Sequence, residues 1–120
     1  MYIGAYDGTY RVFTAGESLG GAFKAVSLDE NGLKIGGDVP VGLTAAEVET
    51  IAAGEPCNTL VEGIGYWTAG EELDGGDLLA SDSLGSAVIA TSGKYVFARA
   101  LDDALKGEAC KVLITNAGKL

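Results

Sequence analysis

Five carboxylates lie close together in the middle of the sequence, within the stretch "GEELDGGDLLASD" (residues 70–82). They are Glu71, Glu72, Asp74, Asp77 and Asp82. Two facing carboxylates can hydrolyse glycosidic bonds when the pKa of one is raised, and several together can bind calcium. The spacing lacks the alternating ligands and the terminal glutamate of an EF-hand loop. We therefore interpret the stretch as a solvated acidic turn, with a hydrolase using Glu72 and Asp77 as an alternative.

The other chemically reactive residue types are scarce. The sequence has no histidine and two cysteines, which excludes Ser–His–Asp and Cys–His catalysis and most zinc sites. Cys57 and Cys110 form no CxxC motif, and Lys111 is the one basic residue beside either of them. We expect two small buried side chains, although a disulfide between them stays possible. No enzymatic activity, metal or cofactor is expected.

The charge balance is acidic, with 17 acidic and 8 basic residues and a net charge of −9. Binding to phosphate backbones or anionic membranes requires clustered lysine and arginine, and no basic tail or stripe is present. The beginning, "MYIGAYDGTYRVF", lacks the basic and apolar regions of a signal peptide, and no apolar run could span a membrane. We therefore expect no direct nucleic-acid or membrane partner, and synthesis in the cytoplasm.

A repeated phrase organises the chain. "FTAGESLGG" (residues 13–21) recurs as "WTAGEELDG" (residues 67–75), and "GEPC" ending at Cys57 recurs as "GEAC" ending at Cys110. We interpret residues 13–63 and 67–116 as two copies of one unit. Two copies are too few for a solenoid. They predict a single closed, pseudo-two-fold β domain over residues 13–120, preceded by an N-terminal arm, residues 1–12.

Each unit is predicted to consist of short strands. "TYRVFTA", "GYWTA", "AFKAVSL" and "YVFARAL" are rich in β-branched and aromatic residues, and "DENG" (residues 29–32) carries the Asn-Gly signal of a hairpin. "PCNTLVEGI" and "ACKVLITN" are predicted closing strands. The fold class is therefore mainly β, a compact barrel or sandwich of about eight or more short strands.

One short helix is predicted near residues 45–53. In "LTAAEVETIAAGEP" Thr44 is a candidate N-cap and Glu47 lies three residues later, as in a capping box. Gly54 and Pro56 follow as stop signals. The corresponding stretch of the second unit, "ALDDALKGE", predicts a helical turn or a loop.

The arm carries tyrosines at a regular spacing. Tyr2, Tyr6 and Tyr10 recur every four residues in a glycine-containing stretch that also holds Ile3 and Val12. Exposed aromatic and aliphatic side chains on an arm favour contact with a partner, whereas the same residues would also suit an edge strand packed on its own domain. We expect these five residues to contribute to partner binding.

The glycine and apolar pattern resembles that of capsid decoration, or cement, proteins of tailed bacteriophages. The resemblance rests on "AGEELDGGDLLASDSLGSAVIAT" and "ARALDDALKGEACKVLI", and covers most of residues 13–115. The matching positions are Ala69, Gly70, Gly76, Asp77, Asp82, Gly85, Ala87, Ala100, Leu101, Gly107, Glu108, Val112, Leu113 and Ile114. The tyrosine-bearing start and the predicted helix depart from the family pattern.

The resemblance implies a structural protein of the virion. Such a protein binds the exterior of an assembled capsid, bridges neighbouring major capsid protein subunits and forms a homo-oligomer, with a homotrimer favoured. The alternative is a small ligand- or carbohydrate-binding β module. A lipoyl or biotinyl carrier needs a lysine at a hairpin tip, and Lys94 in "TSGKYV" has the wrong neighbours.

Overall fold

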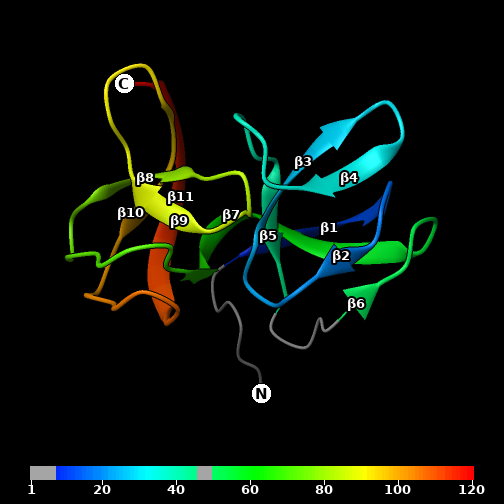
Figure 1. Cartoon of the computed structure of the whole chain (residues 1–120), viewed down its shortest axis with the longest axis horizontal. Helices are drawn as coiled ribbons and strands as arrows, with labels where there is room; N and C mark the ends of the chain where they lie inside the picture. The colour runs from blue at the N-terminus through cyan, green and yellow to red at the C-terminus, as the bar shows by residue number, and fades with distance from the viewer. Residues whose placement is uncertain (1–7, 46–49) are drawn as a thin grey trace.

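The computed structural model describes residues 8–45 and 50–120, which fold into eleven strands (Figure 1). The strands are β1 (Thr9–Thr14), β2 (Leu19–Gly20), β3 (Ala25–Asp29), β4 (Gly32–Ile35), β5 (Gly42–Thr44), β6 (Thr50–Ile51), β7 (Pro56–Thr68), β8 (Leu78–Ser81), β9 (Ala87–Ile89), β10 (Tyr95–Ala100) and β11 (Ala109–Lys119). The predicted mainly β class with eight or more strands is confirmed. Over these residues the structure contains no helix long and apolar enough to cross a membrane.

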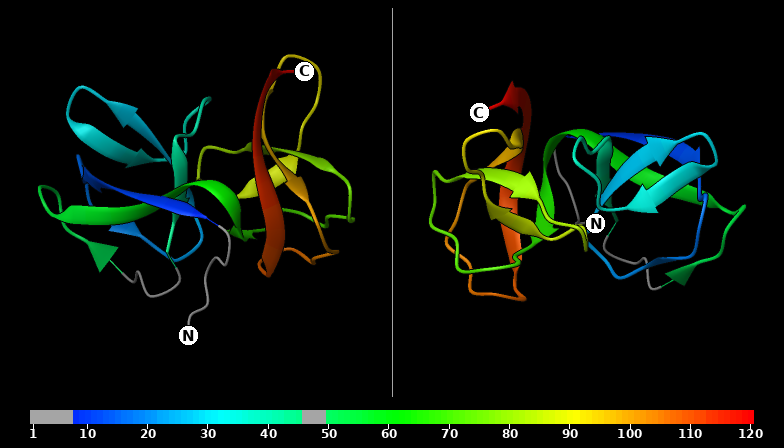
Figure 2. Two further views of the ribbon diagram at one scale, coloured as in Figure 1. Left: turned by 180° about the vertical axis from the view of Figure 1, so that it is seen from behind. Right: turned by 45° about the horizontal axis from the view of Figure 1, so that its top comes forward.

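Nine of the strands form one continuous antiparallel sheet. Its order is β4-β3-β5-β7-β11-β10-β8-β9, and β1 pairs with β7 in addition, while β2 and β6 form a separate two-stranded sheet. The sheet curls into two halves that lie side by side (Figures 1 and 2). The first half contains the described residues up to 62, and the second half contains residues 63–120.

Strand β7 connects the two halves. Its first seven residues, from Pro56 to Glu62, pair with β1, and the remainder, from Gly63 to Thr68, pairs with β11. The sequence pattern predicted two separate strands here, "PCNTLVEGI" and "GYWTA". The structure joins them because Gly63, at φ 105°, turns the strand between its two partners without breaking it.

The same contacts recur in both halves. Across strands, Phe13 lies opposite Cys57 in the first half, and Trp67 lies opposite Cys110 in the second. Ala15 forms a parallel bridge with Leu33, and Ala69 forms one with Ala87. The Ala15 amide donates to the Glu55 carbonyl at 2.9 Å, and the Ala69 amide donates to the Glu108 carbonyl at 2.8 Å. Each pair of contacts starts from equivalent positions of the two repeated phrases, "FTAGESLGG" and "WTAGEELDG". The boundaries 1–12, 13–63 and 67–116 stay predictions, and Thr9–Val12 lie in the same strand as Phe13.

The helix predicted near residues 45–53 is wrong for the residues that the structure describes. Thr44, the expected N-cap, is the last residue of β5, pairs with Thr59 and accepts a hydrogen bond from the Lys24 amide at 2.9 Å. Thr50 and Ile51 form β6. The rest of the capping box, within residues 46–49, lies outside the described residues. Tertiary pairing of buried, β-branched Thr44 outweighs the local capping signal.

The larger core fills the second half and the seam between the halves. Trp67 is fully buried, and its ring meets that of Phe97 edge-on, with the centroids 5.6 Å apart. The Trp67 indole N–H donates to the carbonyl of Gly85 at 2.8 Å, so the polar atom of the side chain is satisfied. The equivalent aromatic of the first half, Phe13, is half-buried against a smaller core that contains Cys57.

Candidate partner-binding surfaces

Two of the five residues predicted to bind a partner lie in the described part of the chain. Tyr10 and Val12 are both in β1, opposite Leu60 and Asn58 of β7. Tyr10 is half-buried and packs against the larger core, whereas Val12 keeps 66% of its surface exposed. Tyr2, Ile3 and Tyr6 lie outside the described residues. The role of all five in binding stays a prediction.

Tyr10 belongs to a cluster of three aromatic side chains. Tyr10, Phe23 and Tyr66 line one small cavity together with Leu43 and Leu60. The rings of Phe23 and Tyr66 lie 5.6 Å apart and are tilted by 57°. Phe23 has a φ of 58°, which is strained for a bulky residue. The carbonyl of Phe23 accepts a hydrogen bond from the Thr68 amide at 2.8 Å, which helps to hold this loop on β7.

Sequence reasoning missed Phe23 and Tyr66 as surface residues. In "GYWTA" the alternation of a strand places Tyr66 and Trp67 on opposite faces, so a buried Trp67 requires an outward Tyr66. That signal was present in the sequence. The position of Phe23 follows from a loop conformation that no local pattern indicates.

The acidic stretch is built into turns. The Asp77 carboxylate accepts the Asp74 amide at 2.8 Å, and one Asp82 oxygen accepts the amides of Leu84 and Ser86 at 2.9 and 2.8 Å. Within residues 8–45 and 50–120, no group of three or more acidic, cysteine or histidine side chains is arranged to hold a metal ion. Asp77 and Asp82 therefore organise the backbone turns beside the larger core.

Glu72 and Asp74 line a separate shallow cavity of about 240 Å³ with Asp103 and Glu108. Two of its carboxylates are engaged by the backbone. Asp103 accepts the Gly75 amide of a neighbouring loop, and Glu108 accepts the Leu105 amide within a turn, both at 2.8 Å. The structure thus brings predicted acidic residues together at one end of the second half. Asp77 does not line this cavity, so Glu72 and Asp77 do not share it.

The two cysteines are free and buried in separate cores. They occupy equivalent positions, opposite Phe13 in the first half and Trp67 in the second. Burial raises the pKa of both thiols above the ordinary value of 9.0. The Cys110 thiol donates to the Asp102 carbonyl at 3.4 Å, and the nearby carboxylates of Asp102, Asp103 and Asp77 add to the increase in its pKa. A low-pKa nucleophile is therefore not found at either position.

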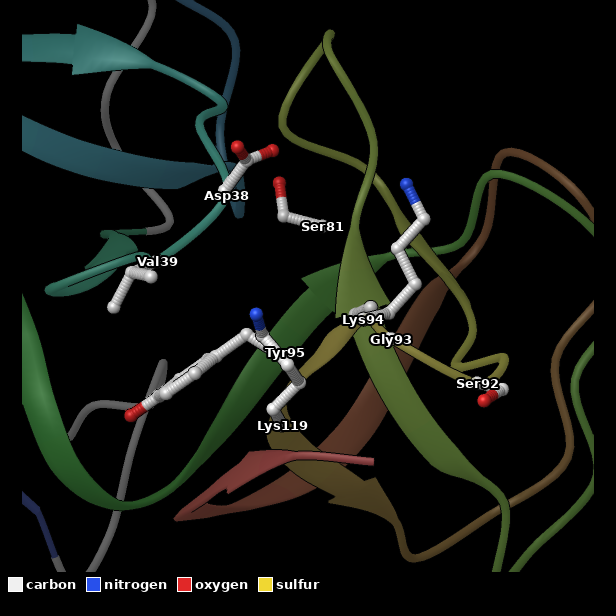
Figure 3. A pocket seen from close by; sticks show the side chains of 9 residues that line it. Asp38, Val39, Ser81, Ser92, Gly93, Lys94, Tyr95 and Lys119 are labelled. Carbon is white, nitrogen blue, oxygen red and sulfur yellow. The ribbon is translucent and has the colours of Figure 1, made fainter.

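An open groove separates the two halves on one side of the molecule, and we call it the inter-half groove (Figure 3). It consists of two adjoining cavities of about 480 and 390 Å³ that share Asp38, Ser81 and Lys94. The larger one is also lined by Val39, Ala80, Ser92, Gly93, Tyr95 and Lys119, and the smaller one by Lys34, Ile35, Gly37, Asp82 and Ser83. Three of the eight basic residues of the chain therefore face one groove.

Both walls of the groove are fixed by the backbone. On the first half, Gly36 has a φ of 76°, and a Cβ at this position would lie 2.5 Å from the carbonyl oxygen of Ser83. Only glycine allows this close approach of the β4–β5 loop to the β8–β9 loop. On the second half, the Leu120 amide donates to the Lys94 carbonyl at 2.8 Å, and Tyr95 pairs with Lys119.

No protein-family model matches the chain, and no curated protein matches it either. The fold, by contrast, occurs in a solved structure of a phage head component. This chain is similar to the N base of head fiber gp8.5 of bacteriophage phi29, seen by crystallography. The TM-score is 0.66 at 19% sequence identity, and the match covers 93% of this chain and 97% of that chain. At this identity the likeness shows a shared fold.

Proposed function

We propose that this protein is a structural component of a phage virion that binds the exterior of the assembled capsid. The observation that carries the proposal is the fold match, which spans nearly the whole of both chains. It coincides with the resemblance of the "TAGE" and "GEAC" segments to capsid decoration proteins. The first similarity compares backbones, and the second compares residue patterns.

The protein acts by binding, without chemistry. The Asp77 and Asp82 carboxylates serve as acceptors in turns, and both thiols are buried. An acidic surface suits the outside of a capsid because it avoids non-specific binding to packaged DNA. A protein that binds only the assembled shell stabilises it by mass action, and many copies on one lattice add avidity.

In this proposal the protein bridges neighbouring major capsid protein subunits as a homotrimer. Its partner-binding residues are Tyr2, Ile3, Tyr6, Tyr10 and Val12, with Val12 presenting the largest exposed apolar surface of the two described ones. The aromatic cluster around Tyr10 extends this surface to Phe23 and Tyr66.

The direct test mixes the purified protein with expanded heads of candidate phages and sediments them. We expect saturable co-sedimentation, and an increase in the temperature at which the heads release DNA. Single-particle images of the mixture then show whether the density lies between coat subunits. Heads that bind no protein at any ratio would overturn the proposal. The mass of the free protein in solution tests the trimer separately.

The contribution of the arm is tested by deleting residues 2–7, which leaves all of β1 in place. We expect weaker head binding and an unchanged free energy of unfolding. A second variant, Val12→Ser, changes one exposed side chain in β1. It tests the part of the proposed binding surface that lies in this strand. Equal decoration by wild type and both variants would remove these residues from the binding site.

A small ligand- or carbohydrate-binding module is the second candidate, because the larger cavity of the inter-half groove, about 480 Å³, is in the size range of ligand sites. A panel of neutral oligosaccharides, tested by calorimetry, distinguishes this function from head binding.

A further inference from the structure

We propose that the inter-half groove binds an extended, acidic polypeptide segment of a partner protein. The groove collects Lys34, Lys94 and Lys119 on a chain whose net charge is −9. Two aspartates line it as well, Asp38 and Asp82, so the lysines outnumber the acids there. This local reversal of charge sign favours a ligand with carboxylates.

The three lysine side chains have no partner among the residues that the structure describes. Lys24, in contrast, donates to the Ser86 hydroxyl at 2.9 Å, and Lys111 also has an interaction partner. Lys34, Lys94 and Lys119 are exposed, and neither a hydrogen bond nor an ion pair engages their amino groups in the described chain. Three ammonium groups in one groove are therefore available to an external anion.

The positions of the lysines favour a long ligand over a compact one. Lys34 lines only the smaller cavity, Lys119 lines only the larger, and Lys94 lines both. Asp38, which the two cavities share, would repel a densely charged ligand such as a nucleic acid. A chain with negative charges separated by neutral groups matches this alternation, and an extended polypeptide places every second side chain on the same side.

The remaining groove surface also fits a polypeptide. Val39 is 54% exposed and offers an apolar contact, and Ser81 faces the space beside Asp38 (Figure 3). Tyr95, the aromatic residue of the lining, packs against the larger core, and its hydroxyl donates to Asn116 at 3.1 Å. These two contacts hold the Tyr95 ring in place at the wall of the groove.

The first test measures the fluorescence anisotropy of a labelled twelve-residue peptide of alternating glutamate and threonine. We expect saturable binding to the wild-type protein that weakens as salt is raised from about 0.05 to 0.5 M, because exposed charges are screened. The double variant Lys94→Glu/Lys119→Glu should bind about tenfold more weakly or worse, and Lys94→Gln/Lys119→Gln should be intermediate. Circular dichroism confirms that both variants are folded.

The matched control is Arg99→Glu/Lys106→Glu, which makes the same change in net charge outside both the groove and the N-terminal arm. We expect it to bind the peptide nearly as well as the wild type. The proposal is overturned if this control loses as much affinity, or if a glutamine–threonine peptide binds equally well. It is also overturned if only a neutral oligosaccharide, and no acidic peptide, occupies the groove.

If the proposed function is correct, the partner that supplies the acidic segment is a coat subunit. This step rests on the proposed function, and the groove proposal and the proposed function can fail separately. If the groove takes a coat segment, the Lys94→Glu/Lys119→Glu variant should bind heads at least several-fold more weakly than the Arg99→Glu/Lys106→Glu control. Unchanged head binding by the groove variant would exclude a coat segment from the groove and leave the proposed function intact. Heads that fail to bind the wild type overturn the proposed function, whereas the peptide measurement still decides the groove.

Discussion

The Glu71 carboxylate accepts the backbone N–H of Ile89 at 2.7 Å. Ile89 ends β9, which is the last strand of the nine-stranded sheet. In the first half, Glu17 accepts the N–H of Ile35 at 3.2 Å, and Ile35 ends β4 at the opposite end of the same sheet. The glutamate of each "TAGE" phrase thus satisfies a donor on an edge strand, where an open N–H would invite pairing with another chain.

Removing the Glu71 carboxylate should therefore destabilise the fold. We expect Glu71→Ala to lower the free energy of unfolding by about 1 kcal/mol, because the Ile89 donor loses its acceptor. Glu71→Gln keeps a carbonyl acceptor and should lose less. Urea unfolding measures both, and Glu17→Ala is the matched variant, with a smaller loss expected from its longer hydrogen bond. Equal losses for the alanine and glutamine variants would contradict this role.

Gly85 should be irreplaceable at the seam between the halves. Its carbonyl accepts both the Trp67 indole N–H and the Ala25 amide, each at 2.8 Å, and a Cβ there would lie 2.7 Å from the Ala25 oxygen. We expect Gly85→Ala to lower the free energy of unfolding by roughly 3 kcal/mol, since both strain and overpacking result.

The control for this change is Gly76→Ala. Gly76 also has a positive φ, 97°, but a Cβ there would meet no atom within 4 Å. We expect a loss of only about 1 kcal/mol, from backbone strain alone. Thermal unfolding of the two variants separates strain from close approach. Similar losses of stability in both variants would show that the close approach of Gly85 to Ala25 adds nothing to the cost of backbone strain.

Much of the fold was predictable because its signals are local. The Asp29–Gly32 hairpin follows from the Asn-Gly pair, and β1, β11 and the two parts of β7 follow from runs of β-branched and apolar residues. The pattern predicted the two parts of β7 as separate strands. The helix prediction failed because Thr44 satisfies its hydrogen bonds with the Lys24 amide and the distant β7, a tertiary outcome that a capping pattern does not include.

The inter-half groove was not predictable in the same way. Lys34, Lys94 and Lys119 are single basic residues far apart in the sequence, and none belongs to a motif. They come together because Gly36 lets the β4–β5 loop approach the second half, and because β10 pairs with the last residues of β11. Tyr10 and Val12, by contrast, could be singled out from the sequence. They belong to one short stretch in which tyrosines recur every four residues.

Replacing Ser27 with alanine should stabilise the fold. Its side chain is buried, with 6% of the residue exposed, and no hydrogen bond satisfies its hydroxyl within the described part of the chain. We expect Ser27→Ala to raise the free energy of unfolding by up to about 1 kcal/mol. Ser81 follows Ser27 by 54 residues, the offset that also separates Phe13 from Trp67, so it is the matched residue of the second unit. Its hydroxyl donates to the Asp82 carbonyl at 2.9 Å, so Ser81→Ala should be neutral or destabilising. A clear loss for Ser27→Ala would contradict this reading of the core.

The buried thiols should make the fold sensitive to alkaline pH. Burial raises the pKa of Cys57 and Cys110 above 9.0, so the unfolded chain releases these protons at a lower pH than the folded one. Their contribution to stability is complete below the ordinary pKa and is lost as the pH rises through the folded pKa. We expect the free energy of unfolding to fall between about pH 8 and pH 10, before lysine and tyrosine dominate the titration.

The double variant Cys57→Ala/Cys110→Ala should be less stable at pH 7, since both side chains are packed, yet show a flatter dependence on pH. Urea unfolding at a series of pH values compares the slopes, and parallel slopes for the two proteins would exclude the thiols as its source.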